Sequence, residues 1–268
     1  MKKITANGLN FVTGLKGQGP KLLFISGTGG DLRCENTPLT SPLTQDFQIL
    51  THDQRGMGQS DKPEHPYTMR DYAEDAIAIL DIYEWDDVLL VGYSFGGMVA
   101  QEIAIRWPER VKRLVLIGTA AGGKGGSSYP LENLFDLPPK DRTRQGLEIM
   151  DLRFTPEWQA NNPELAQKRI QDGILSQKEF AHEPGAVMGA RRQLEARASH
   201  DTFERLNRIT APTLVLSGTY DGQAPMPAQK AMAEAIPNGQ FETMEGSHAM
   251  LWESNAVFER ITQFMQGL

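Results

Sequence analysis

Short apolar runs recur along the chain, and most are separated by longer stretches in which polar and apolar residues mix. Runs of this length without alternation are typical of strands that are buried on both faces. Each of these runs is therefore predicted to be a strand of a central sheet. The predicted strands span residues 22–26, 47–53, 88–92, 113–118, 213–218 and 239–245.

Apolar residues at helical spacing separate most of the predicted strands, and the pattern is clearest between residues 68 and 85. Its apolar positions share one helical face: Tyr72, Ala76, Ile79 and Tyr83. Thr68 and Asp71 have the spacing of a capping box, which marks the start of this helix. Strands that alternate with helices predict an α/β fold with a mostly parallel sheet covered by helices on both faces.

One long segment interrupts the alternation of strands and helices. Between about residues 122 and 205 no strand is predicted, whereas residues 140–152, 163–178 and 186–199 have helical patterns between prolines and glycines. An insertion of this size between two core strands predicts a helical cap. We therefore expect an α/β core formed by residues 1–121 and 206–268, with residues 122–205 inserted as the cap.

The charge balance excludes one class of function and limits others. The 268 residues include 27 Lys and Arg against 34 Asp and Glu, a formal net charge of −7. Because binding to nucleic acids depends on basic surface, no nucleic-acid partner is expected. No apolar run approaches the roughly 20 residues of a membrane helix, and the amino-terminal residues lack the apolar core of a signal peptide. The expectation is a cytoplasmic protein with no membrane partner; the sequence leaves its oligomeric state open.

A serine interrupts the apolar pattern where one predicted strand ends. The sequence GYSFG at residues 92–96 joins the strand at 88–92 to a helical pattern that includes Met98. Gly-x-Ser-x-Gly between a strand and a helix is the nucleophile elbow, in which a strained turn exposes the serine hydroxyl. The alternative is an ordinary Gly/Ser turn with a solvated hydroxyl. In this context the motif favours Ser94 as a nucleophile.

A nucleophilic serine needs a base and an acid that orients the base. Asp221 follows the predicted strand at 213–218, and His248 follows the last one. Because the carboxyl ends of parallel strands meet at one edge of a sheet, both are expected to lie near Ser94. The loop after residues 113–118 offers no competing acid, since Thr119 stands there. The remaining histidines are interpreted as surface or structural residues: His52, His65, His182 and His200.

Acyl transfer also needs donors for the oxyanion. The backbone N–H of Phe95 would lie at the start of the helix after Ser94, where the helix dipole is positive. The second donor is expected from the glycine-rich loop after the strand at 22–26, and its position favours the backbone N–H of Thr28. The glycines around Thr28 let this loop approach a ligand closely.

These motifs resemble the α/β-hydrolase superfamily with a helical cap, nearly from end to end. GYSFGG, YDGQAP (220–225) and GSH (246–248) are similar to the family's triad motifs, and HDQRGMGQSDKP (52–63) is similar to an architectural turn near its site. Many relatives have His-Gly before the oxyanion residue, whereas this chain has Ser26 and Gly27. The sequence is most similar to small-molecule esterases and enol-lactonases.

No motif for a metal or an organic cofactor is present, so none is expected. There is no H-E-x-x-H and no pair of cysteines. Residues 118–124 imitate a phosphate-binding loop, but Gly125 stands where Ser or Thr is required. Residues 27–32 imitate a dinucleotide fingerprint, but Leu32 stands where the third glycine is required. The single cysteine, Cys34, is expected to be an ordinary buried thiol.

The leading hypothesis is a serine hydrolase that cleaves a small-molecule carboxylic ester or lactone through an acyl-enzyme. Serine at position 94 disfavours the dehalogenase and epoxide-hydrolase branches that the resemblance allows. Hydrolysis of a C–C bond and haloperoxidase-like perhydrolysis use the same triad and remain alternatives. A ligand receptor built on this fold is an alternative of another class. A helical cap would enclose a pocket of limited size, which favours small or medium substrates over long-chain lipids.

Overall fold

Eight strands form one sheet in the computed structural model, which describes residues 1–268. Their order across the sheet is β1-β2-β4-β3-β5-β6-β7-β8, and all neighbours from β4 to β8 are parallel. The α/β fold and the mostly parallel sheet are therefore confirmed. The strands are β1 (Lys2–Ala6), β2 (Leu9–Lys16), β3 (Lys21–Ile25), β4 (Gln48–His52), β5 (Val88–Tyr93), β6 (Val111–Ile117), β7 (Thr213–Gly218) and β8 (Gly239–Met244).

The six predicted strands are present, but the sequence analysis missed the antiparallel hairpin of β1 and β2. Asn7 and Gly8 join these strands with φ values of 47° and 77°. Two consecutive positive φ values define the tight turn that Asn-Gly favours in hairpins. In β1, Ile4 and Ala6 are buried whereas their neighbours are exposed, so this edge of the sheet alternates instead of forming an apolar run.

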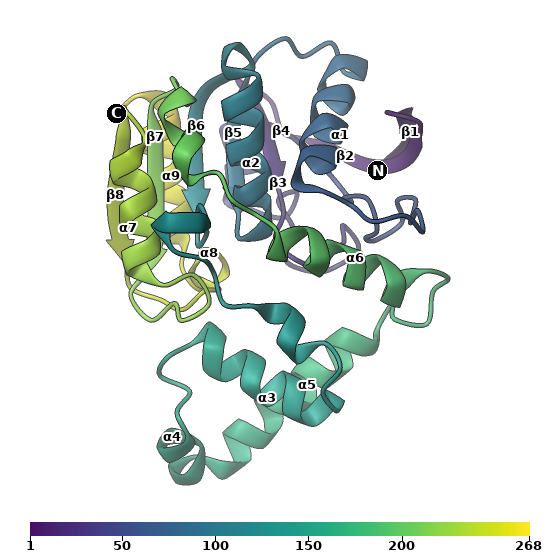
Figure 1. Ribbon diagram of the computed structural model, residues 1–268, viewed down its shortest axis with the longest axis vertical. Coiled ribbons are helices and arrows are strands. Elements are labelled where there is room, and N and C mark those ends of the chain that lie inside the picture. The colour runs from purple at the N-terminus through teal and green to yellow at the C-terminus, as the bar shows by residue number, and fades with distance from the viewer.

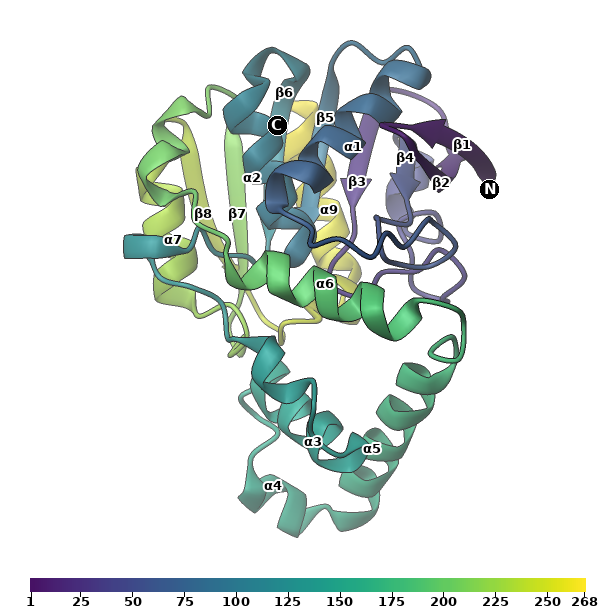
Figure 2. The same ribbon diagram turned by 45° about the vertical axis from the view of Figure 1, so that its right-hand side comes forward.

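Helices cover both faces of the sheet (Figures 1 and 2). On one face lie α1 (Met69–Ile82), α2 (Phe95–Arg106) and α7 (Met226–Ala235), whose apolar residues form one core cluster with the sheet. On the other face α9 (Asn255–Gln266), which follows the short α8 (Met250–Glu253), forms a second cluster. Thr68 and Asp71 make the capping box predicted for α1.

The segment between β6 and β7 contains only helices. They are α3 (Pro139–Met150), α4 (Pro156–Asn161), α5 (Pro163–Lys178) and α6 (Ala186–Ala198), which we call the helical lobe, and short 3₁₀ turns flank them. Three of these match the predicted helices, and α4 is an addition to them. Helices α3, α4 and α5 project from the sheet, whereas α6 lies between them and the carboxyl ends of the strands (Figures 1 and 2).

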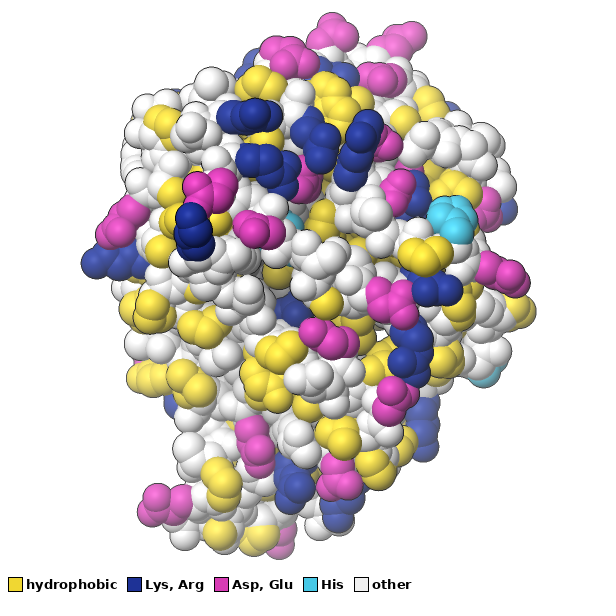
Figure 3. Space-filling view, in the orientation of Figure 1, with side chains coloured by type: hydrophobic (Ala, Val, Ile, Leu, Met, Phe, Trp, Pro, Cys, Tyr) yellow, Lys and Arg dark blue, Asp and Glu magenta, His cyan; other side chains and the backbone are white.

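The visible surface mixes charges of both signs over the core and the lobe (Figure 3). Several of the basic side chains are paired, as Arg70 is with Glu74 and Arg205 with Glu102. None of the helices combines the length and the apolar character that crossing a bilayer would require.

Cys34 is exposed, so the expectation of a buried thiol is wrong. Its backbone N–H closes a turn with the carbonyl of Asp31, 3.1 Å away, in the loop between β3 and β4. Cysteines are most often buried, but that tendency applies to residues on elements that face a core. A turn residue outside the sheet and the helices has no such face.

Candidate active site

Ser94 occupies the turn between β5 and α2, with φ 53° and ψ −118°. A positive φ strains any residue with a side chain, and such strain persists only where the surroundings enforce it. The glycines that flank Ser94 are part of that enforcement. A Cβ atom at Gly96 would collide with the carbonyl of Ile25, and one at Gly92 would collide with the backbone of α2. This is the geometry predicted for the GYSFG motif.

The structure brings Ser94, Asp221 and His248 together, as the sequence predicts. Ser94 Oγ lies 2.9 Å from His248 Nε2, and His248 Nδ1 lies 2.9 Å from Asp221 Oδ2. The carboxylate accepts the Nδ1 proton, so the Nε2 lone pair faces the serine hydroxyl. All three side chains are at most 5% exposed. The arrangement can withdraw a proton from the hydroxyl as its oxygen attacks an electrophile.

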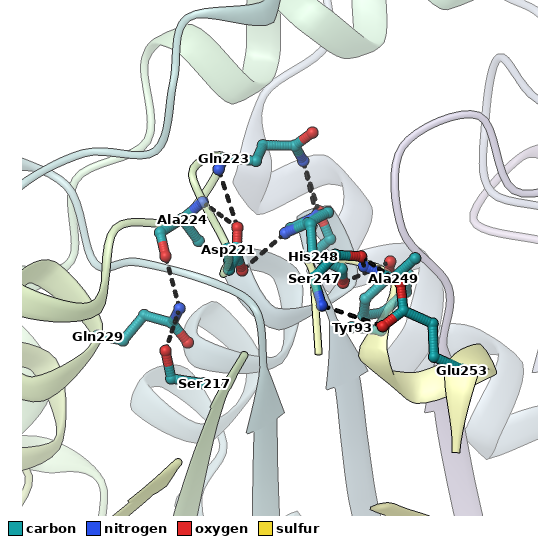
Figure 4. A network of polar contacts seen from close by, with 11 residues as sticks. Tyr93, Ser217, Asp221, Gln223, Ala224, Gln229, Ser247, His248, Ala249 and Glu253 are labelled. Atoms are coloured by element: carbon teal, nitrogen blue, oxygen red, sulfur yellow. Dashed lines mark hydrogen bonds and ion pairs between the residues drawn. The ribbon is translucent and has the colours of Figure 1, made fainter. Parts of the chain in front are cut away.

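Asp221 is held in place by its own loop. Its Oδ1 accepts backbone N–H donors from Gln223 and Ala224, at 2.9 and 2.8 Å, while Oδ2 faces the histidine (Figure 4). Hydrogen bonds to both oxygens fix the position of the carboxylate. A fixed carboxylate fixes the tautomer and the ring plane of His248.

The helical lobe contacts the two loops that carry Asp221 and His248. Met150, the last residue of α3, accepts the backbone N–H of His248 at 2.8 Å. Leu152 donates its N–H to the carbonyl of Tyr220 at 3.0 Å. On the sheet side, the hydroxyl of Tyr93 donates to the carbonyl of His248, and burial raises the pKa of this phenol, which keeps its proton in place. The histidine backbone is thus held by the core and the lobe together.

The two expected oxyanion donors belong to two segments next to Ser94. Phe95 is the first residue of α2, so its N–H has no acceptor within the helix. The Thr28 N–H donates to no acceptor of the chain, and a Cβ atom at the adjacent Gly27 would lie 3.3 Å from Ser94 Cβ. The loop of Thr28 therefore runs alongside the serine with a free N–H.

The segment from residue 52 to 63 supports the site without joining it. Asp53 is buried and accepts N–H donors from Leu32 and Gln59, which ties this turn to the loop of Thr28. Burial raises the pKa of Asp53 to about 6. Arg55 forms a buried, two-bond ion pair with Asp75 of α1. Asp53 makes no hydrogen bond to His248, so Asp221 is the acid that contacts the base.

Two glutamines at the site were missed by the sequence analysis. Gln223 places its amide nitrogen 2.7 Å from His248 Nε2 and 3.4 Å from Ser94 Oγ (Figure 4). Gln193 of α6 accepts the N–H of Gly29, next to Thr28, at 2.8 Å, and its own amide nitrogen has no partner. The sequence held one signal for Gln223, since a polar residue two positions after the predicted acid lies in the same loop of the site. No signal could reveal Gln193, because its contact depends on where the lobe docks.

The remaining histidines make no contact with Ser94 or Asp221. His52 and His200 are buried, which lowers the pKa of each to about 4 and keeps both neutral. His65 and His182 are exposed. No group of three or more His, Cys, Asp or Glu side chains is arranged to hold a metal ion.

The comparison with known families agrees with this geometry. A family model described as alpha/beta hydrolase fold matches residues 20–255. The chain belongs to this family. The match covers strands β3 to β8, the positions of Ser94, Asp221 and His248, and the helical lobe between β6 and β7. The chain is therefore a hydrolase of the α/β-hydrolase family.

Relatives of this α/β hydrolase act on different substrates. It is 31% identical to a poly(3-hydroxyalkanoate) depolymerase of Ectopseudomonas oleovorans, over 91% of this chain and 84% of the relative. It is also 31% identical to a 2-hydroxymuconate semialdehyde hydrolase of Pseudomonas sp. strain CF600, over 89% and 83%. The enol-lactonase of Burkholderia xenovorans LB400 has the same fold, with a TM-score of 0.78 over 100% of both chains at 21% identity. These comparisons give the family and the fold, while the substrate is open.

Proposed function

We propose that this α/β hydrolase cleaves a small-molecule carboxylic ester or lactone through an acyl-enzyme. The observation that carries the proposal is the buried hydrogen-bonded chain from Ser94 Oγ through His248 to Asp221, with 2.9 Å at each step. Such a chain lets a neutral serine attack a carbonyl carbon at neutral pH, because the imidazole takes the proton as the bond forms.

In the first half-reaction, Ser94 Oγ bonds to the carbonyl carbon and its proton passes to His248 Nε2. The carbonyl oxygen becomes an oxyanion, which the N–H groups of Phe95 and Thr28 would hold. The carbon–oxygen bond to the alcohol part then breaks, and the Nε2 proton moves to the departing oxygen. In the second half-reaction, water gives a proton to His248 Nε2 and its oxygen bonds to the acyl carbon. The bond from this carbon to Ser94 Oγ then breaks and the Nε2 proton moves to Oγ, which releases the carboxylic acid and restores Ser94.

In this proposal residues 122–205 act as a cap inserted in a core formed by residues 1–121 and 206–268. Gln193 of α6 contacts the loop of Thr28, and the end of α3 contacts the loops of Asp221 and His248. In this proposal the lobe makes these contacts, encloses the site and excludes water from it. Exclusion of water strengthens the hydrogen bonds to the oxyanion. We therefore propose small or medium acyl substrates.

The test is turnover of a panel of esters, lactones and vinylogous diketones by the purified protein. We expect multiple turnovers on short and medium esters or lactones, with no increase at an emulsified interface. Fluorophosphonate is expected to label the wild-type protein but not Ser94→Ala, whose kcat falls at least about a thousandfold. Ser176→Ala, which removes an exposed hydroxyl of the lobe, is the matched control. Labelling that survives in Ser94→Ala would overturn the assignment.

Hydrolysis of a C–C bond is the second candidate function. The 31% identity to a 2-hydroxymuconate semialdehyde hydrolase favours it. The same three residues would serve, with a carbon atom as the leaving group. Turnover of the diketones without turnover of any ester or lactone would select this candidate. Binding of a panel member without multiple turnovers would instead favour a receptor.

A further inference from the structure

The amide of Gln223 occupies a position against the reacting atoms that the mechanism above does not use. Its nitrogen lies 2.7 Å from His248 Nε2 and 3.4 Å from Ser94 Oγ, and the residue is 6% exposed. The sequence places it in the same loop as Asp221, two residues further on. No other side chain outside Ser94, Asp221 and His248 forms hydrogen bonds with two of the reacting atoms.

Hydrogen-bond accounting fixes which end of the amide faces the histidine. The Nδ1 proton of His248 is held by Asp221, so Nε2 is an acceptor with one lone pair in the ring plane. Only the NH₂ end of Gln223 can donate to that lone pair. The hydroxyl of Ser94 donates to the same lone pair from 2.9 Å, so the two donors share one acceptor.

The backbone of Gln223 is held on both sides, so only its side chain is free to move. Its N–H donates to Asp221 Oδ1 at 2.9 Å, and its carbonyl accepts the N–H of Tyr129 at 2.7 Å. Rotation about the side-chain bonds can shift the NH₂ group while these hydrogen bonds keep it near the reacting atoms. The amide is therefore a tethered donor.

We propose that Gln223 is a further catalytic residue, which donates a hydrogen bond to the leaving-group oxygen. This inference rests on the proposed serine hydrolysis. In acylation the bond from the carbonyl carbon to the leaving oxygen breaks, the electron pair goes to that oxygen, and the proton on His248 Nε2 follows. The departing oxygen must lie within reach of His248 Nε2 and close to Ser94 Oγ, where the amide nitrogen now lies. The amide moves out of this position and keeps both its protons. One of its N–H groups then donates a hydrogen bond to the departing oxygen.

This role has a signature in the leaving group. An alkoxide or enolate is a poor leaving group whose negative charge develops on the oxygen atom. Hydrogen bonds to charged groups are stronger than those between neutral groups. A nitrophenolate spreads its charge over the ring and needs the donor much less. Gln223 is therefore expected to extend the substrate range toward unactivated esters and lactones.

The experiment measures kcat/KM for acetate esters of p-nitrophenol, phenol and ethanol with the wild-type protein, Gln223→Leu and Gln223→Met. Both variants remove the donor without adding a charge beside His248, and the methionine variant keeps the length of the side chain. We expect both to lose about tenfold to a hundredfold on ethyl acetate and less than about threefold on the nitrophenyl ester. Gln229→Leu is the matched control, since this buried glutamine binds Ser217 and the carbonyl of Ala224 without contacting a reacting atom. Any loss in the control is expected to be equal for all three esters.

Three results would overturn the assignment. Equal losses on all three esters in both Gln223 variants would make the residue structural. Faster turnover of every ester by both variants would show that the amide only competes with the Ser94 hydroxyl for His248 Nε2. A wild-type protein that hydrolyses none of the esters or lactones and resists fluorophosphonate would remove the proposed function itself, and the inference with it.

Discussion

The sheet core and the helical lobe differ in what holds them together. In α2 of the core eleven of twelve residues are buried, whereas in α5 of the lobe only two of sixteen are. The apolar centre of the lobe is a cluster around Phe154, Ala166 and Ile170, far smaller than either cluster of the core. Hydrophobic burial stabilises the core. The lobe depends more on hydrogen bonds to the loops of the site, so its geometry is coupled to that of the site.

The largest effect is expected from the acid of the core. Asp221→Asn removes the carboxylate that orients His248, and kcat is expected to fall by about ten thousandfold with little change in KM. His248→Ala is expected to act on the same step, so adding Ser94→Ala to either variant costs little more. Steady-state kinetics on an activated ester test this. A wild-type kcat in Asp221→Asn would point to another acid.

The contrast in burial predicts that truncating an apolar residue lowers the free energy of unfolding more in the core than in the lobe. Leu116→Ala in β6 leaves a cavity in the fully buried core and is expected to lower the free energy of unfolding by about 3–5 kcal/mol. Ile170→Ala in α5 is expected to cost about 1–2 kcal/mol, because its cluster is small and partly open to solvent. Urea denaturation of both variants measures the difference. Equal costs would show that lobe and core are stabilised alike.

One glycine of the lobe allows it to lie against the core. A Cβ atom at Gly189 of α6 would collide with the carbonyl of Gly56, so Gly189→Ala is expected to displace α6 and lower stability by about 1–3 kcal/mol. At Gly146 of α3 a Cβ atom meets nothing, and Gly146→Ala is expected to stabilise by about 0.5–1 kcal/mol. Thermal melts and kcat/KM compare the two variants. Loss of activity in Gly189→Ala alone would tie the docked lobe to function.

Two buried histidines, His52 in the core and His200 after the lobe, make stability depend on pH. The folded-state pKa values of His52 and His200 lie near 4, below their ordinary value, so the unfolded chain binds more protons between pH 4 and 6.5. Stability is therefore lost as the pH falls through this range, by about 1.4 kcal/mol per pH unit for each histidine. Asp53, with a raised pKa of about 6, opposes this loss. His200→Leu is expected to reduce the pH slope of urea midpoints; an unchanged slope would contradict this.

The parts predicted from the sequence are those whose signal is local. Most of the parallel strands contain a short apolar run, and the elbow around Ser94 carries its own glycines. The fold and the meeting of Ser94 with Asp221 and His248 could therefore be predicted. The β1–β2 hairpin was missed because burial alternates in β1, polar residues interrupt the apolar residues of β2, and the Asn7–Gly8 turn was not recognised. Gln193 could not be predicted, since its role depends on packing between elements far apart in the sequence.

The contact between α3 and His248 matters for anyone who wishes to exchange the lobe for that of a relative. Met150 ends α3, and the carbonyls at a helix end have no partner of their own, so the N–H of His248 completes the helix. A transplanted lobe that ends its first helix elsewhere leaves both groups without a partner and frees the histidine loop. We expect chimeras to keep activity only when the graft retains a helix end at this point, whatever the shape of the pocket it brings.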